Sequence, residues 1–145
     1  MLFDLVGDER NVSKLLLIKH ERPELGTLIK EISATSGQAY KQLEAFVKAD
    51  PTLDVRSEIL PATERQTRDR IGKDRAKELL KAKGKNLELS LLLTQNEALV
   101  YGSHLAAVLA ASETVPARRE FLQRVAGDLG RLQAKVLEML LAHYS

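Results

Sequence analysis

The chain has 145 residues, of which 44% are hydrophobic and 29% charged, and 22 basic against 20 acidic side chains leave a net charge of +2. This length and apolar fraction predict one globular domain, residues 1–145, because both lie in the usual range for a single domain. No cysteine is present, which excludes disulfides, thiolate nucleophiles, iron–sulfur clusters and cysteine zinc sites.

The sequence predicts a cytoplasmic protein without a membrane segment. Absence of cysteine is compatible with a reducing compartment. Residues 1–10 carry three acidic side chains and no basic n-region, so they do not have the pattern of a secretion signal. The longest apolar stretch, 87–111, is interrupted by charged and polar side chains and falls short of the roughly 18 residues that a membrane span needs.

Apolar residues recur at helical spacing along most of the chain. The pattern predicts a short helix over residues 11–20. Pro23 suits the first turn of a long helix, which runs to about residue 49 and is ended by the Asp50-Pro51 pair. The apolar residues of 52–60 lack helical spacing, so we expect an extended connection there.

The second half predicts three more helices. The helix over 61–83 is poor in apolar residues, and Gly84 suits its C-terminal end. Asn86 is expected to cap the helix over 87–112, which is the most apolar segment and is therefore expected to be the most buried. Pro116 opens the last helix, which runs to about residue 143.

These lengths predict the architecture. Four long helices joined by short connections can bury their apolar stripes only by lying side by side. The connections at 84–85 and 113–115 are too short to travel the length of a helix, so the helices they join must be antiparallel. We predict an all-α fold: an antiparallel, up-down-up-down four-helix bundle with a short extra N-terminal helix.

A four-helix bundle can hold a dimetal site built from Glu-x-x-His pairs and further glutamates. None of the three histidines, His20, His104 and His143, follows a glutamate at that spacing. Glu97 and His104 are seven residues apart, about 10 Å along a helix, which is too far to chelate one ion. We therefore expect no metal site and no cofactor.

Polar side chains interrupt the most apolar helix. Glu88 and Gln95 fall on one line that otherwise looks like a core seam, and Glu97, Tyr101 and His104 follow a second line beside it. Buried carboxylates and amides need partners, and the candidates for Glu88 are Arg68, Arg75, Ser33, Thr35, Ser36 and Tyr40. The cluster is either structural, fixing helix register, or a ligand or proton-transfer site, whose candidate ligand-binding residues are Glu88, Gln95, Glu97, Tyr101 and His104.

The helix over 61–83 holds eight basic and four acidic side chains. A basic stripe on one helix face can contact phosphates. This segment has no interleaved aromatic residue and no helix-turn-helix punctuation, and acidic neighbours at helical spacing favour a solvated face. The pattern argues against a nucleic-acid partner.

No phosphate loop, Gly-x-Ser-x-Gly element or Ser/His/Asp set is present, so we expect no catalytic residue.

The stretches 60–64 and 88–106 resemble a group of uncharacterised bacterial helical proteins of about this length. The outline over 23–143 is similar to that of the ferritin-like four-helix bundles. The resemblance implies a bundle. It implies no ligand residues, because the Glu-x-x-His pairs are absent and the connection at Gly84 is too short for the ferritin crossover.

The sequence favours a non-catalytic module that acts through self-association or protein–protein interaction. Leu91, Leu92 and Leu93 are consecutive and must point in three directions, so even a central helix keeps one side for a partner. We therefore expect a homodimer, with an unknown protein partner as the other option. The alternative is a ferritin-like bundle that binds a metal or small molecule near Glu97, Tyr101 and His104, or near Glu88 and Gln95.

Overall fold

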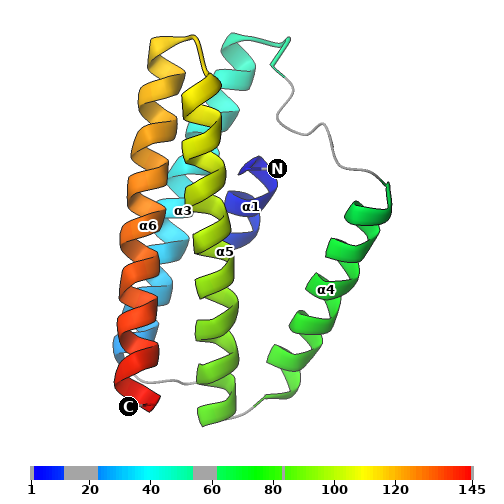
Figure 1. Ribbon diagram of the computed structural model, residues 1–145, viewed down its shortest axis with the longest axis vertical. Coiled ribbons are helices and arrows are strands. Elements are labelled where there is room, and N and C mark those ends of the chain that lie inside the picture. Colours follow the sequence, from blue (N-terminus) through cyan, green and yellow to red (C-terminus); the bar gives the residue numbers. More distant parts are fainter. Residues whose placement is uncertain (1, 12–22, 54–61, 83, 145) are drawn as a thin grey trace.

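The structure, a computed structural model, describes residues 2–11, 23–53, 62–82 and 84–144 (Figure 1). In these ranges the fold is all-helical, with no strand, as predicted. The helices are α1 (Leu2–Glu9), α3 (Pro23–Ala49), α4 (Ala62–Lys81), α5 (Lys85–Ser112) and α6 (Pro116–Tyr144). None of the described helices is both long and apolar enough to cross a membrane.

Proline and glycine residues explain most helix ends. Helix α3 has the predicted bounds, and α6 begins at Pro116 as expected. Helix α5 begins at Lys85, two residues before the predicted start, with Gly84 as its N-cap and no side-chain cap hydrogen bond. The predicted Asn86 cap is wrong, because the backbone already enters the helix before that residue.

Helix α1 is the element that the sequence analysis missed. The short helix predicted over 11–20 lies outside the described residues except at Asn11, which is in a turn. Leu2, Val6 and Glu9 of α1 are buried at helical spacing. Because so short a helix is marginal on its own in water, its burial against the longer helices stabilises it.

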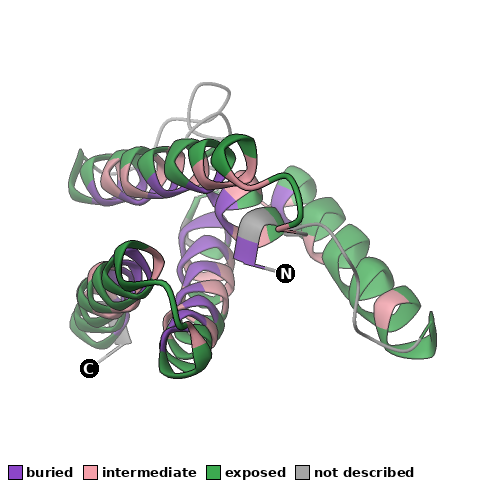
Figure 2. Ribbon diagram, turned by 90° about the horizontal axis from the view of Figure 1, so that it is seen from above, coloured by how far each residue is buried: buried purple, intermediate pink, exposed green. Residues whose placement is uncertain are grey.

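Two glycines let α1 approach its neighbours closely. A Cβ atom built on Gly7 would lie 3.2 Å from Cε2 of Tyr40 in α3, and one built on Gly102 of α5 would lie 2.8 Å from Cδ2 of Leu5. Helix α1 therefore contacts both α3 and α5, and Figures 1 and 2 place it between them.

Helices α5 and α6 form the longest contact in the molecule. In Figure 1, α5 rises from the lower end, and α6 descends beside it, while α3 lies behind the pair. Their apolar faces, with those of α1 and α3, enclose one core (Figure 2). The largest fully buried apolar side chains are Leu25, Ile29, Ile32, Leu91, Leu92, Leu99, Leu129, Leu132, Val6 and Val136.

Arg118 ties three helix ends together. Its guanidinium group lies 3.2 Å from Oδ2 of Asp50, just after α3, and 3.3 Å from Oε1 of Glu113 in the α5–α6 turn. The same Glu113 oxygen accepts hydrogen bonds from the backbone N–H groups of Thr114 and Val115, each 3.0 Å long. These contacts fix the turn from which α6 starts.

Helix α4 diverges from the other helices in Figure 1. Leu79 is its one buried residue among those described, whereas Ile71 and Leu80 are exposed. The reason lies in its composition, since a helix that is polar all round has no apolar stripe to bury. Besides Leu79, polar side chains of α4 contact the body, and they form part of the candidate site.

Candidate functional site

The five predicted ligand-binding residues lie on two opposite sides of α5. Glu88 and Gln95 are buried, with 8% and 2% of their surface exposed. Glu97, Tyr101 and His104 are exposed on the other side of the helix. The structure therefore does not bring the five into one site, because the two lines are separated by the thickness of the helix.

Two residues of the exposed line, Glu97 and Tyr101, contact α4. Arg75 forms an ion pair with Glu97. Arg68 donates a hydrogen bond of 3.0 Å from Nη1 to the Tyr101 hydroxyl, and its guanidinium carbon lies 5.2 Å from the centre of the Tyr101 ring. Hydrogen bonds to Tyr101 and then to Glu64 raise the pKa of Arg68. Arg68 and Arg75, two of the candidate partners of Glu88, thus contact Tyr101 and Glu97, because α4 approaches the far side of α5.

Removing these two polar attachments should loosen α4 without unfolding the body. Exposed ion pairs contribute about 0–1 kcal/mol each, so we expect the double variant Arg68→Ala/Arg75→Ala to lose less than about 2 kcal/mol of global stability. Hydrogen–deuterium exchange measured by mass spectrometry should become faster in α4 while α5 and α6 stay protected. The control is Arg70→Ala/Lys77→Ala, since both of those side chains are exposed on α4. Equal exchange in α4 of both double variants would contradict this attachment.

Helices α1, α3 and α5 each bury a polar side chain. Ser36 of α3, Gln95 of α5 and Glu9 of α1 are buried. Their side-chain oxygens Oγ, Oε1 and Oε2 have no hydrogen-bond partner in the part of the chain that the structure describes. Gln95 was a predicted site residue and Ser36 a predicted donor, whereas Glu9 was missed together with α1.

The contacts of α1 place Glu9 near this level of the core. Leu5 lies against Gly102, and the Ser33 hydroxyl donates a hydrogen bond to the carbonyl oxygen of Arg10. In Figure 1, α1 descends while α5 rises. One turn after Leu5, Glu9 therefore lies toward the Gln95 end of α5, at the level of residues 33–37 of α3.

Burial changes the acidity of Glu9. Loss of solvent, and next the nearby charge of Asp8, raise the pKa of Glu9 to about 8. Glu9 is therefore protonated at neutral pH and can donate a hydrogen bond inside the core. A buried neutral carboxyl group can form a hydrogen bond or store a proton. Within the described ranges no group of three or more His, Cys, Asp or Glu side chains could hold a metal ion.

A further feature is an apolar surface on the outer side of α5 and α6. Leu91 and Leu92 are buried, whereas Leu93 is 48% exposed, so the three leucines point in different directions as predicted. Helix α5 is thus apolar on both sides but buried on one, and its other side is exposed among the residues that the structure describes. The other exposed large apolar residues of these helices are Val100, Tyr101, Val108, Leu109, Leu137 and Leu141.

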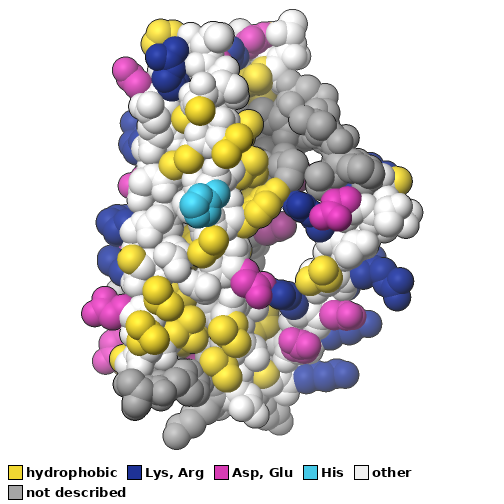
Figure 3. Space-filling view, viewed as in Figure 1, with side chains coloured by type: hydrophobic (Ala, Val, Ile, Leu, Met, Phe, Trp, Pro, Cys, Tyr) yellow, Lys and Arg dark blue, Asp and Glu magenta, His cyan; other side chains and the backbone are white. Residues whose placement is uncertain are grey.

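We define the α5–α6 face as the part of this surface that spans both helices. Gln133 of α6 donates a 2.7 Å hydrogen bond to Asn96 of α5, which brings the two lines of residues side by side. The face consists of Leu93, Val100, Ala107, Ala111, Gly127, Gly130, Ala134, Leu137 and Leu141. In Figure 3, hydrophobic side chains gather over α5 and α6, and charged side chains lie mainly at the edges and on α4.

No family model, no curated protein and no solved structure matches this chain.

Proposed function

We propose that this chain is a non-catalytic, cytoplasmic helical module that acts by self-association, and that two copies form a homodimer through the α5–α6 face. The observation that carries the proposal is the exposure of large apolar side chains on adjoining sides of α5 and α6. We also propose that the helices form an antiparallel, up-down-up-down four-helix bundle in which α4 is the loosely attached member.

Physical chemistry supports a partner on this face. Contiguous exposed apolar surface is unfavourable in water and commonly marks an interaction site. Fully burying a leucine side chain contributes about 1.5–3 kcal/mol, and Leu137 and Leu141 are 42% and 62% exposed. The exposed charged residues beside the face, such as Glu97 and Glu138, would lie at the rim of the interface, where polar residues are usual.

Two glycines of α6 also support a partner on the α5–α6 face. Glycine inside a helix costs about 1 kcal/mol relative to alanine. Nothing lies within 4 Å of a Cβ built on Gly127 or Gly130, so contacts inside the described chain do not require either glycine. A second helix that packs closely on this face would give both residues a role.

The proposal predicts a concentration-dependent dimer. Sedimentation equilibrium at micromolar concentration should give the mass of two chains for the natural protein. Leu137→Glu should weaken dimerisation by at least about tenfold, because a charge then has to be desolvated in the interface. The matched control is Ile71→Glu on α4, whose side chain is 47% exposed and lies outside the face. A strictly monomeric natural protein, or equal dimerisation of the two variants, would contradict the proposal.

A second candidate function is binding of a small molecule or metal in the core, as in the ferritin-like alternative. The unpaired side-chain oxygens of Glu9, Ser36 and Gln95 favour it. Gln95 is the predicted site residue that this candidate uses, while Glu97 and Tyr101 are engaged by α4. Native mass spectrometry of gently purified protein tests it, because a bound molecule or metal ion would add a stoichiometric mass.

A further inference from the structure

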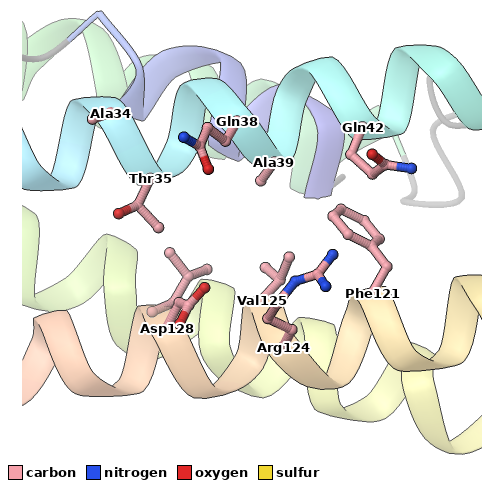
Figure 4. Close-up of a pocket in the computed structure, with 10 residues that line it drawn as sticks. Ala34, Thr35, Gln38, Ala39, Gln42, Phe121, Arg124, Val125 and Asp128 are labelled. Carbon is pink, nitrogen blue, oxygen red and sulfur yellow. The ribbon is translucent and has the colours of Figure 1, made fainter.

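Helices α3 and α6 leave a groove of about 300 Å³ between them. Its floor is apolar and includes Ala39, Val125 and Leu129, with Phe121 at one end. Polar side chains line the rim: Thr35, Gln38 and Gln42 from α3, and Arg124 and Asp128 from α6 (Figure 4). An apolar floor with a few converging polar groups is the usual make-up of a small-molecule site, and this volume lies at the lower end of the range for such sites.

The two charged residues of the groove, Arg124 and Asp128, do not form an ion pair with each other. Arg124 and Asp128 are one helical turn, or about 6 Å, apart along α6. This spacing allows an ion pair, but neither side chain forms one with any residue that the structure describes. Both extend toward α3 in Figure 4, and the Arg124 guanidinium carbon lies 6.0 Å from the centre of the Phe121 ring.

The neighbouring charges do not neutralise the pair. Arg131, whose field reaches Asp128, is engaged by Glu31 at 2.8 Å. Lys135 binds the same Glu31 carboxylate at 2.9 Å. The groove therefore presents one cation and one anion, separated along an apolar floor and both accessible from solvent.

We propose that this groove binds a free α-amino acid with an apolar side chain. The ligand's carboxylate would meet the Arg124 guanidinium, which can hold a carboxylate through two parallel hydrogen bonds. Its ammonium group would meet Asp128, and its side chain would lie on Ala39 and Val125. A ligand that carries both charges a few ångströms apart bridges the pair, whereas a ligand with one charge leaves the other residue without a partner.

This site is separate from the α5–α6 face. Arg124 and Asp128 lie on the flank of α6 that faces α3, while Leu137 and Gly130 lie on its outer side. Binding in the groove is therefore independent of the proposed dimer, and Leu137→Glu should bind the ligand like the natural protein.

Isothermal titration calorimetry with L-leucine, N-acetyl-L-leucine and L-leucinamide tests the proposal. We expect saturable binding of L-leucine and at least about tenfold weaker binding of each blocked compound, because each lacks one charged partner. Arg124→Gln should weaken L-leucine binding at least about tenfold and leave leucinamide binding unchanged. Asp128→Asn should do the converse, weakening L-leucine binding while leaving N-acetyl-L-leucine binding unchanged.

The control is Arg70→Gln, the same change on the exposed surface of α4, with circular dichroism to verify helix content in every variant. It should bind L-leucine like the natural protein. Absence of saturable L-leucine binding at millimolar concentration would overturn the proposal. So would equal affinity for the three compounds, or unchanged L-leucine affinity of a folded Arg124→Gln protein.

Discussion

Raising the pH from about 4.5 to about 8 should lower the free energy of unfolding by several kcal/mol through one side chain, Glu9. Burial and the charge of Asp8 raise the pKa of this carboxyl from 4.5 to about 8. A raised carboxyl pKa means that the folded state holds the proton more tightly than the unfolded state. The stability it provides is complete below pH 4.5 and is lost as the pH rises through 8. At about 1.4 kcal/mol per pKa unit, the loss is on the order of 4–5 kcal/mol.

The measurement is urea unfolding at pH values from 5 to 9, for the natural protein and Glu9→Gln. The neutral amide removes the ionisation, so the stability of Glu9→Gln should vary much less over this range and exceed that of the natural protein at pH 9. Glu44→Gln, a change at an exposed position of α3, is the control and should keep the pH dependence of the natural protein. A pH dependence in Glu9→Gln as steep as in the natural protein would contradict the buried state of Glu9.

Other carboxyls act in the opposite direction at acidic pH. Hydrogen bonds from Arg131 and Lys135 lower the pKa of Glu31, and those from Thr52 lower the pKa of Asp50. The stability that these groups provide is present at neutral pH and is lost as the pH falls through their lowered folded-state pKa values. Measurements between pH 5 and 9 therefore separate the Glu9 effect from theirs.

Shortening a core side chain of α5 should lower the free energy of unfolding by an amount comparable to the Glu9 effect. Leu99 has 0% exposure, so Leu99→Ala removes buried apolar surface and leaves a cavity, which costs about 2–5 kcal/mol. Since whole domains are stable by about 5–15 kcal/mol, this single change should shift the urea midpoint strongly downward.

Leu80→Ala provides the matched comparison, because the side chain of Leu80 is 63% exposed on α4. We expect it to change stability by less than about 1 kcal/mol. Similar losses in the two variants would show that Leu99 is not part of a packed core. Circular dichroism followed during unfolding gives both values directly.

Much of the helical framework could be predicted because its signals are local. Pro23 and the Asp50-Pro51 pair bracket α3, and the predicted and observed bounds agree. Helix α1 was not predicted, although four of its eight residues are apolar and Leu2 and Val6 have helical spacing, because eight residues give only about two turns of pattern. Its stability depends on Gly102 and Tyr40, which are distant in the sequence.

The candidate site could be predicted only in part from the sequence. Gln95 stood out as a polar residue in an apolar seam, and the structure buries it. The burial of Glu9 could not be foreseen without α1. The groove at Arg124 and Asp128 was also missed, because ordinary surface residues of α3 and α6 become a site only through the way the two helices cross.

One backbone position sets the direction of a whole helix. Gly84, between α4 and α5, has φ 58° and ψ −132°, a conformation that suits glycine and strains other residues. Helix α4 has 20 residues and is therefore about 30 Å long. Turning it by about 20° at this position would move its far end by about 10 Å, and it would also displace Leu79, which belongs to the core. The conformation of Gly84 therefore affects both the outline of the molecule and its core.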